Sequence, residues 1–180
     1  MADATKVKTV VGGVLYRAPL GTALPSSAES TLPGAYVDMG YWAEDGSTLT
    51  PVPGDTVEII AHTGATVISR QKKGNVTLEF PFIETTKDVF ETYWDTTVAA
   101  DGSYEIQGGS ANKEYILVYD RLYSDDTSDR IVAQRANIAE RAGQTNSEGD
   151  ALTYGMTFQT LEPAGGGAHI IGWAPEFATE

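Results

Sequence analysis

Alternation of apolar and polar residues with a period of two points this chain toward a mainly β fold. In residues 76–82, and again in residues 152–158, every second residue is apolar and the residues between are mostly Thr, Gly, Glu or Pro. Successive side chains of a strand point to opposite faces of a sheet. Each stretch therefore predicts a strand with one buried face and one polar face.

Four further segments and one continuous apolar run extend this prediction. Residues 115–119 (Tyr-Ile-Leu-Val-Tyr) are apolar throughout, which is typical of a central strand covered on both faces. Additional strands are expected at residues 10–16, 57–61, 66–69 and 131–138. The tripeptide His62-Thr63-Gly64 separates two of them and predicts a hairpin turn, because glycine tolerates a positive φ.

One segment departs from the period of two. Val89, Phe90, Tyr93 and Trp94 have the i, i+1, i+4, i+5 spacing of one face of a helix, whereas the charged residues of the segment fall on the other side. We expect a short helix over about residues 86–95 that flanks the sheet. Its aromatic residues are expected to be buried against that sheet.

Two stretches predict long irregular loops. Residues 20–33 are rich in Pro, Ser, Ala and Thr, and residues 42–54 contain a turn signal and two prolines. Loops of this length are uncommon in a compact domain unless they are functional. We expect a single domain over residues 1–180, with an N-terminal arm and the first strand in residues 1–16 and a C-terminal tail in residues 165–180.

The charge balance restricts the possible partners. The chain has 12 Lys and Arg against 25 Asp and Glu, so its net charge is −13. Binding of nucleic acid through phosphate neutralisation requires clustered cations, and anionic membranes attract basic segments. Neither partner is expected to be bound here. The first six residues show no secretory signal pattern and no run reaches about 20 apolar residues, so we expect synthesis and folding in a cytoplasm.

The residues that carry enzyme chemistry are sparse. Cysteine is absent, which excludes disulfides and thiolate zinc sites, and His62 and His169 have no metal-ligand spacing. Residues 125–129 have the first spacings of a calcium loop, but Arg130 occupies the position that requires glycine. We expect no catalytic residue, no cofactor and no metal, and interpret the chain as a structural or binding protein.

Two phrases near the N-terminus carry a family resemblance. Residues 13–25 read GVLYRAPLGTALP and residues 36–46 read YVDMGYWAEDG. In this order and spacing they resemble the N-terminal half of the major tail (tail tube) proteins of long, non-contractile-tailed bacteriophages, the siphophages, particularly those of actinobacterial hosts. The expected helix and the strand at residues 152–161 fit the same family, so the similarity covers most of the chain.

The resemblance implies a β-sandwich or half-barrel with one flanking helix. Six copies would form a ring whose inner strands join into a barrel around a lumen, and the rings would stack into the tail tube of the virion. The implied function is a negatively charged conduit for genome DNA during ejection, without specific DNA binding, catalysis or membrane contact. The implied partners are further copies of the chain, the tape measure protein, and the tail terminator and distal tail proteins.

In this family the contacts between rings involve an N-terminal arm and a long loop between early strands. The matching positions here are the arm before Tyr16 and the loop at residues 42–54, with residues 20–33 as an added candidate. The resulting interface candidates are Val14, Tyr16, Tyr41, Trp42, Glu44, Asp45, Leu49 and Val52. The polar face of the late strand supplies the candidates for the lumen, Thr153, Thr157 and Gln159.

Two alternatives remain open from the sequence. One is a tube subunit of a related contractile injection or secretion device, which shares the fold. The other is a small β-sandwich head–tail connector or binding module. Such a module needs a cluster of exposed aromatic residues on one face, which Tyr36, Tyr41 and Trp42 could supply.

Overall fold

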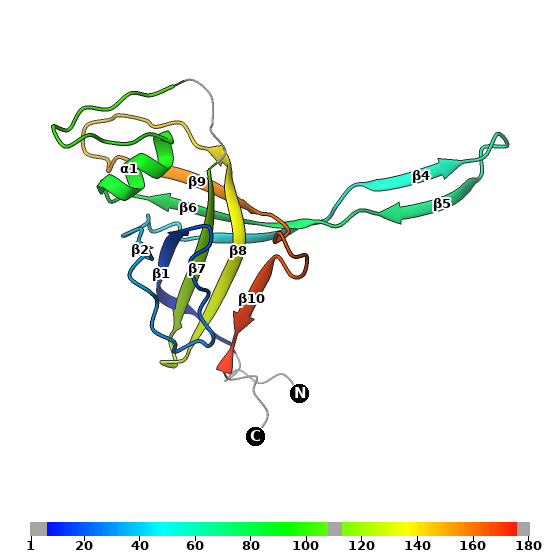
Figure 1. The fold of residues 1–180 in the computed structure, drawn as a ribbon, viewed down its shortest axis with the longest axis horizontal. Coiled ribbons are helices and arrows are strands. Elements are labelled where there is room, and N and C mark those ends of the chain that lie inside the picture. Colours follow the sequence, from blue (N-terminus) through cyan, green and yellow to red (C-terminus); the bar gives the residue numbers. More distant parts are fainter. Residues whose placement is uncertain (1–6, 108–112, 176–180) are drawn as a thin grey trace.

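The computed structural model describes residues 7–107 and 113–175, and it is mainly β, as the sequence predicts (Figure 1). Residues 1–6 of the expected arm and 176–180 of the expected tail lie outside the described residues. The described part forms ten strands and one helix: β1 (Val10–Pro19), β2 (Val37–Asp38), β3 (Thr48–Val52), β4 (Thr56–Ile60), β5 (Thr66–Gln71), β6 (Asn75–Phe82), α1 (Lys87–Trp94), β7 (Glu114–Tyr123), β8 (Ser128–Arg141), β9 (Tyr154–Thr160) and β10 (Ile170–Trp173).

Eight strands form one antiparallel sheet that curls over itself. Seven follow the order β2-β1-β7-β8-β9-β6-β3, and β10 pairs with β8 outside this path. The 14-residue β8 connects the two halves, because it pairs with β7 along most of its length and with β9 from Ala136 to Arg141. Register shifts in both pairings mark β-bulges, which bend a strand. β6 and β9 thus cross β1 and β7 (Figure 1), and the predicted sandwich or half-barrel is confirmed.

The core fills the space inside this curl. The two alternating segments become β6 and β9, and their apolar residues Phe80, Phe82, Met156 and Phe158 are fully buried. Burying a large aromatic or aliphatic side chain contributes about 1.5–3 kcal/mol each. Phe80 contacts the ring of Tyr119 edge to face, with ring centroids 5.1 Å apart. The period-two pattern therefore identified the residues that close the two halves of the sheet on each other.

The apolar run at residues 115–119 is covered on both faces, as expected. Its odd-numbered residues join the main core, and Ile116 and Val118 join a second, smaller cluster with Ala18 and Val132. Tyr36, Leu32 and Trp173 pack on that second cluster. The outer face of β7 is therefore closed by the chain's own loop and C-terminal strand.

The helix occupies the expected place, but the residues that it buries differ from those expected. Its N-cap is Thr86, whose side chain accepts a hydrogen bond of 3.2 Å from the Val89 N–H. The buried residues are Val89, Thr92 and Tyr93, whereas Phe90 and Trp94 are only half-buried at the margin of the core. The i, i+3, i+4 set thus faces the sheet, and the helix covers one end of the half-barrel.

The expected loop at residues 20–33 is irregular, and internal contacts hold it. Arg130, 7% exposed, donates bidentate hydrogen bonds of 2.7 Å to Asp120 and further bonds to the carbonyls of Ser27 and Ser30. The Tyr36 hydroxyl donates to the Ala23 carbonyl at 3.0 Å. Removing these partners would leave a buried charge without compensation, which strongly destabilises a folded protein. Contacts within the chain therefore order this loop.

The expected loop at residues 42–54 and the expected tail at residues 165–180 are each partly strand. Residues 48–52 form β3, which pairs with β6 from Asn75 to Glu79. Ala43 and Tyr41 also exchange backbone bonds with Pro81 and Ile83. In the tail, residues 170–173 form β10 on β8. A deletion of residues 42–54 would therefore remove a sheet strand and not a loop.

Candidate functional site

The first candidate surface is the polar face of β9, which turns away from the core. Thr157 and Gln159 alternate with the buried residues of β9 and are half-buried, and Thr153 lies one residue before the strand. Thr77 of β6 pairs with Gln159 on this face, as does Asn137 of β8. We call the surface formed by β3, β6, β9 and the end of β8 on this side the open face.

Two carboxylates flank the middle of the open face. Thr157 pairs with Glu79 of β6 on one side and with Glu140 of β8 on the other, so these side chains form one row across three strands. Glu79 and Glu140 are exposed, and neither forms an ion pair within the described residues. The row can therefore present uncompensated negative charge to whatever lies next to the open face.

A third carboxylate near the open face is neutralised. Arg135 donates hydrogen bonds of 2.8 and 2.7 Å to the two carboxylate oxygens of Glu114. These bonds hold the pKa of Glu114 below its ordinary value, and burial opposes them only in part. Glu114 is matched by a cation, so Glu79 and Glu140 carry the free charge of this surface.

The second candidate surface is a long hairpin that projects from the body (Figure 1). β4 and β5 pair only with each other in the described structure and continue from β3 and β6. The predicted turn is present, since the Gly64 N–H donates to the Ala61 carbonyl and Gly64 has a φ of +83°. A two-stranded ribbon is at best marginally stable alone in water. The hairpin is thus a candidate for ordering against another molecule.

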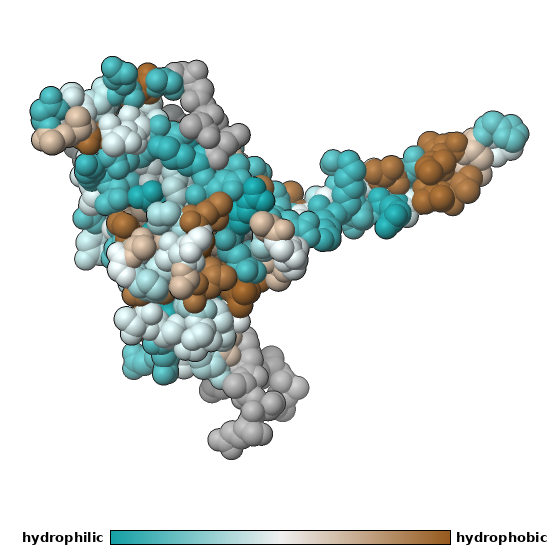
Figure 2. Space-filling view, in the orientation of Figure 1, coloured by the Kyte–Doolittle hydropathy of each residue, from teal (hydrophilic) through white to brown (hydrophobic). Residues whose placement is uncertain are grey.

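One face of the hairpin is apolar and ends in a cation. Val57 pairs with Arg70 and Ile59 pairs with Ile68, so these four side chains share a face. Figure 2 shows hydrophobic side chains gathered along the hairpin. Among them, Val57, Ile59 and Ile68 are each 45–55% exposed. Such apolar exposure on a projection is typical of an interaction site.

The base of the hairpin is a close crossing of two backbones. A Cβ at Gly54 would lie 2.3 Å from the Lys72 carbonyl oxygen, and one at Gly74 would lie 2.1 Å from the Val52 carbonyl oxygen. Only glycine permits this approach. The Lys72 N–H also donates to the Asp55 carbonyl at 2.8 Å. We call residues 53–55 and 72–74 the neck, and it sets the direction of the hairpin relative to the sheet.

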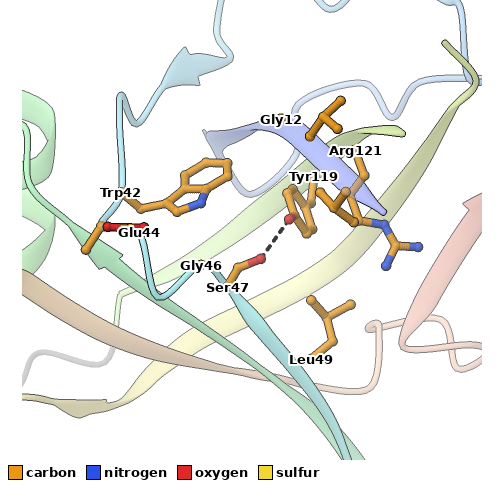
Figure 3. Close-up of a pocket in the computed structure, with 11 residues that line it drawn as sticks. Gly12, Trp42, Glu44, Gly46, Ser47, Leu49, Tyr119 and Arg121 are labelled. Carbon is orange, nitrogen blue, oxygen red and sulfur yellow. Dashed lines mark hydrogen bonds between the residues drawn. The ribbon is translucent and has the colours of Figure 1, made fainter. Parts of the chain in front are cut away.

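The third candidate surface is a hollow where the two ends of the curled sheet face each other. It has a volume of about 550 Å³ and lies between the start of β1, residues 42–49 and β7 (Figure 3). Ser47 and Tyr119 are joined across it by a hydrogen bond of 2.7 Å between their hydroxyls. Val10, Val11, Trp42 and Leu49 provide apolar lining. We call this the seam hollow.

The charges around the seam hollow are unequal. Arg121 lines it, but its guanidinium donates two hydrogen bonds to Asp129 and is neutralised by that carboxylate. Glu44 and Asp45 lie exposed in the turn beside it and form no ion pair within residues 7–107 and 113–175. The rim of the hollow is therefore anionic.

A comparison with protein families identifies the family of this chain. A family model described as phage tail tube protein matches residues 1–177, nearly the whole chain. The chain belongs to the phage tail tube protein family. None of the curated proteins compared with it matches. A tail tube protein is a structural component of the phage virion and is located in its tail.

The tail tube protein holds its predicted interface residues in three separate places. Trp42, Glu44 and Leu49 line the seam hollow, and the side chains of Trp42 and Leu49 also pack on the core. Asp45 lies in the same turn as Glu44, and Tyr41, 78% exposed, does not line the hollow. Val52 is the last residue of β3 and lies next to the neck. Val14 and Tyr16 lie on the face of β1 opposite the buried Leu15 and do not line the hollow. The structure does not bring these eight residues into a single patch.

Sequence reasoning missed the hairpin face and the acidic row of the tail tube protein. Residues 57–61 and 66–69 were predicted as strands, but an exposed Ile and a buried Ile look alike in a sequence. The free cation Arg70 was a usable signal, because no other Lys or Arg occurs between it and Arg17. Glu140 could not be placed opposite Thr157, because a β-bulge sets that register.

In the part of the tail tube protein that the structure describes, the single helix has eight residues and is too short and polar to cross a bilayer. Residues 7–107 and 113–175 contain no group of three or more His, Cys, Asp or Glu that could hold a metal ion.

Proposed function

We propose that six copies of this chain form a ring, that the rings stack into the tail tube of a long, non-contractile-tailed phage of an actinobacterial host, and that genome DNA passes through the lumen during ejection. The protein would be made in the host cytoplasm and would contact the tape measure protein inside the tube and the terminator and distal tail proteins at its ends. No catalytic step is involved. The tail tube family supports the structural role.

The observation that carries this proposal is the open face with its acidic row. The face is polar and carries the unpaired Glu79 and Glu140 beside Thr157. If it lines the lumen, negative charge repels the DNA phosphates and prevents the genome from adhering. Six copies at −13 each would give a ring a charge of −78. Thr157 and Gln159 are proposed as lumen residues on this basis, with Thr153 at the margin.

The strand edges of the monomer support closure between copies. In the sheet order, β3 forms one end and the short β2 and β1 form the other, and β2 covers only Tyr16 and Arg17 of β1. Exposed edges are templates for pairing with another chain, and closed barrels remove them. Pairing across copies would satisfy both edges at once.

The structure weighs against the binding-module alternative. The aromatic cluster that such a module needs does not form, because Tyr36 is buried with its hydroxyl bonded to Ala23 and Trp42 packs in the core. Of the three candidates only Tyr41 is well exposed. A contractile injection or secretion device remains the second candidate function, and a sheath gene beside the gene for this chain would favour it.

Electron microscopy and sedimentation of the purified chain test the proposal. We expect the protein to convert from small species to hollow filaments as its concentration rises, since head-to-tail contacts that do not close produce open assemblies. End views of short filaments should show six subunits per ring. A chain that remains monomeric at every concentration and ionic strength, or rings with another number of subunits, would contradict it.

A further inference from the structure

Residues 96–107, which we call the helix loop, follow α1 and lie on the side of the body away from the hairpin tip (Figure 1). The loop contributes no residue to either core cluster, but α1 holds it in place. The Val98 N–H donates to the Glu91 carboxylate at 2.7 Å, and the Lys87 ammonium donates to the Val98 carbonyl at 3.0 Å. The loop is therefore ordered before it meets a ligand, which reduces the entropy that binding would cost.

The helix loop and the start of β7 border a polar hollow of about 670 Å³, a volume typical of small-molecule sites. Asp95 and Lys113 line it and form an ion pair of 3.0 Å, so a carboxylate and an ammonium lie side by side there. Thr97 and Gln107 also line it, and their side chains form no hydrogen bond within the part of the chain that the structure describes. The hollow thus offers both donors and acceptors to a ligand.

An aromatic ring adjoins these polar groups. Tyr104 lines the hollow and is 51% exposed. Its ring meets the ring of Phe90 edge to face, with centroids 4.7 Å apart, and Phe90 in turn lies 6.5 Å from Trp94. The ring of Tyr104 is therefore supported from α1 and remains available for apolar contact.

This lining discriminates between classes of ligand. A purely apolar ligand would leave the polar side chains without partners, which is unfavourable. The net charge of −13 disfavours phosphates and other polyanions. A neutral sugar has hydroxyls that donate and accept hydrogen bonds, and it has C–H faces that can pack on an aromatic ring. Such a ligand satisfies the polar groups of the hollow and the ring of Tyr104 together.

We propose that this hollow binds a neutral oligosaccharide. A hexopyranose ring would pack on Tyr104, and its hydroxyls would bond to Thr97, Gln107 and the pair formed by Asp95 and Lys113. The hollow shares no residue with the open face or with the edge strands β1, β2 and β3, so it would stay accessible in the proposed tube. Each subunit would carry one site, and a polysaccharide surface would meet many weak sites at once, which can raise overall affinity by about 10²–10⁴.

Saturation-transfer NMR on the purified chain tests the site with three neutral probes, maltotriose, cellotriose and triacetylchitotriose. We expect at least one probe to bind with millimolar affinity. The variant Tyr104→Ala should weaken its binding about tenfold, because the aromatic contact is lost. The matched control is Ile106→Ala, since Ile106 is 46% exposed in the same loop but does not line the hollow. This control should bind the probe like the unmodified chain.

A second variant separates contact with the ligand from the order of the loop. Thr97→Val keeps the shape of the side chain and removes its hydroxyl, so it should weaken binding about threefold or more without moving the denaturation midpoint. Absence of binding by all three probes, or equal weakening by Tyr104→Ala and Ile106→Ala, would overturn the site and leave the proposed tube standing. Binding by a chain that forms no tubes would support the site and overturn the tube.

Discussion

Replacing residues 56–71 by the dipeptide Asn-Gly is expected to yield a folded monomer that forms no tubes. The Lys72 N–H and the Asp55 carbonyl are already bonded, so a two-residue turn can close the ladder at the neck. No residue of the removed segment belongs to either core cluster. The free energy of unfolding should therefore change by less than about 1 kcal/mol, as expected for surface changes away from the core. Denaturant unfolding and electron microscopy measure the two results.

A deletion of residues 42–54 is the matched comparison. It removes β3 and the side chains of Trp42 and Leu49, which pack against Phe80 and the rest of the core. Losing a large buried aromatic side chain alone costs about 3–5 kcal/mol, so this variant should not fold. Tubes from the Asn-Gly variant would show that the hairpin is dispensable, and an unfolded Asn-Gly variant would show that the hairpin supports the fold.

Reversing the acidic row is expected to leave assembly intact and to slow DNA ejection. The variant Glu79→Lys with Glu140→Lys keeps the β-strand pairing, since both side chains are exposed on the open face. Twelve lysines per ring of six would attract phosphates, and each phosphate contact weakens with salt at a slope of about −0.9 on logarithmic axes. We expect phage carrying the variant to eject DNA at least tenfold more slowly at low salt, with recovery as the salt concentration rises.

A control with the same change in net charge separates location from total charge. Glu105 and Glu148 are exposed and lie outside the sheet, so Glu105→Lys with Glu148→Lys adds the same four charges per copy. Ejection should remain close to that of the unmodified phage. Equal slowing by both variants would mean that total charge acts and not charge in the lumen. Normal ejection by the open-face variant would remove the electrostatic role of Glu79 and Glu140.

The period of two carried most of the fold prediction. It placed the buried residues of β6 and β9 correctly, because alternation along a strand maps directly onto two faces of a sheet. The helix was found for a similar reason, although the residues it buries differ by a small rotation about its axis. The period of two and the helical spacing are both local patterns, so they can be recognised without knowledge of the tertiary structure.

The predictions of long loops were less accurate, because tertiary contacts determine the structure of these two segments. Pro51 and Pro53 indicated irregular structure at residues 42–54, but β3 is an edge strand that pairs only with β6 in the described sheet, and an edge tolerates proline. At residues 20–33 the order comes from Arg130, which lies about 100 residues later in the chain. Neither the pairing of β3 with β6 nor the contacts of Arg130 with this loop can be predicted from a local sequence pattern.

In the candidate site, too, the local pattern places individual residues on a face but does not identify their neighbours from other strands. Thr157 and Gln159 lie on the polar face that the alternation predicts, but their acidic neighbours come from other strands. The projection of β4 and β5 depends on the glycine crossing at the neck, and the sequence marks those glycines only as turn residues. Pairing partners, and not residue types, define these surfaces.

A three-dimensional reconstruction of filaments assembled from the unmodified chain by electron cryo-microscopy tests the central claim most directly. The proposal predicts a hollow tube in which Thr157, Glu79 and Glu140 of every copy face the lumen. A tube whose lumen is lined by the outer face of β1 and β7, with the open face buried between copies or directed to the outside, would contradict it.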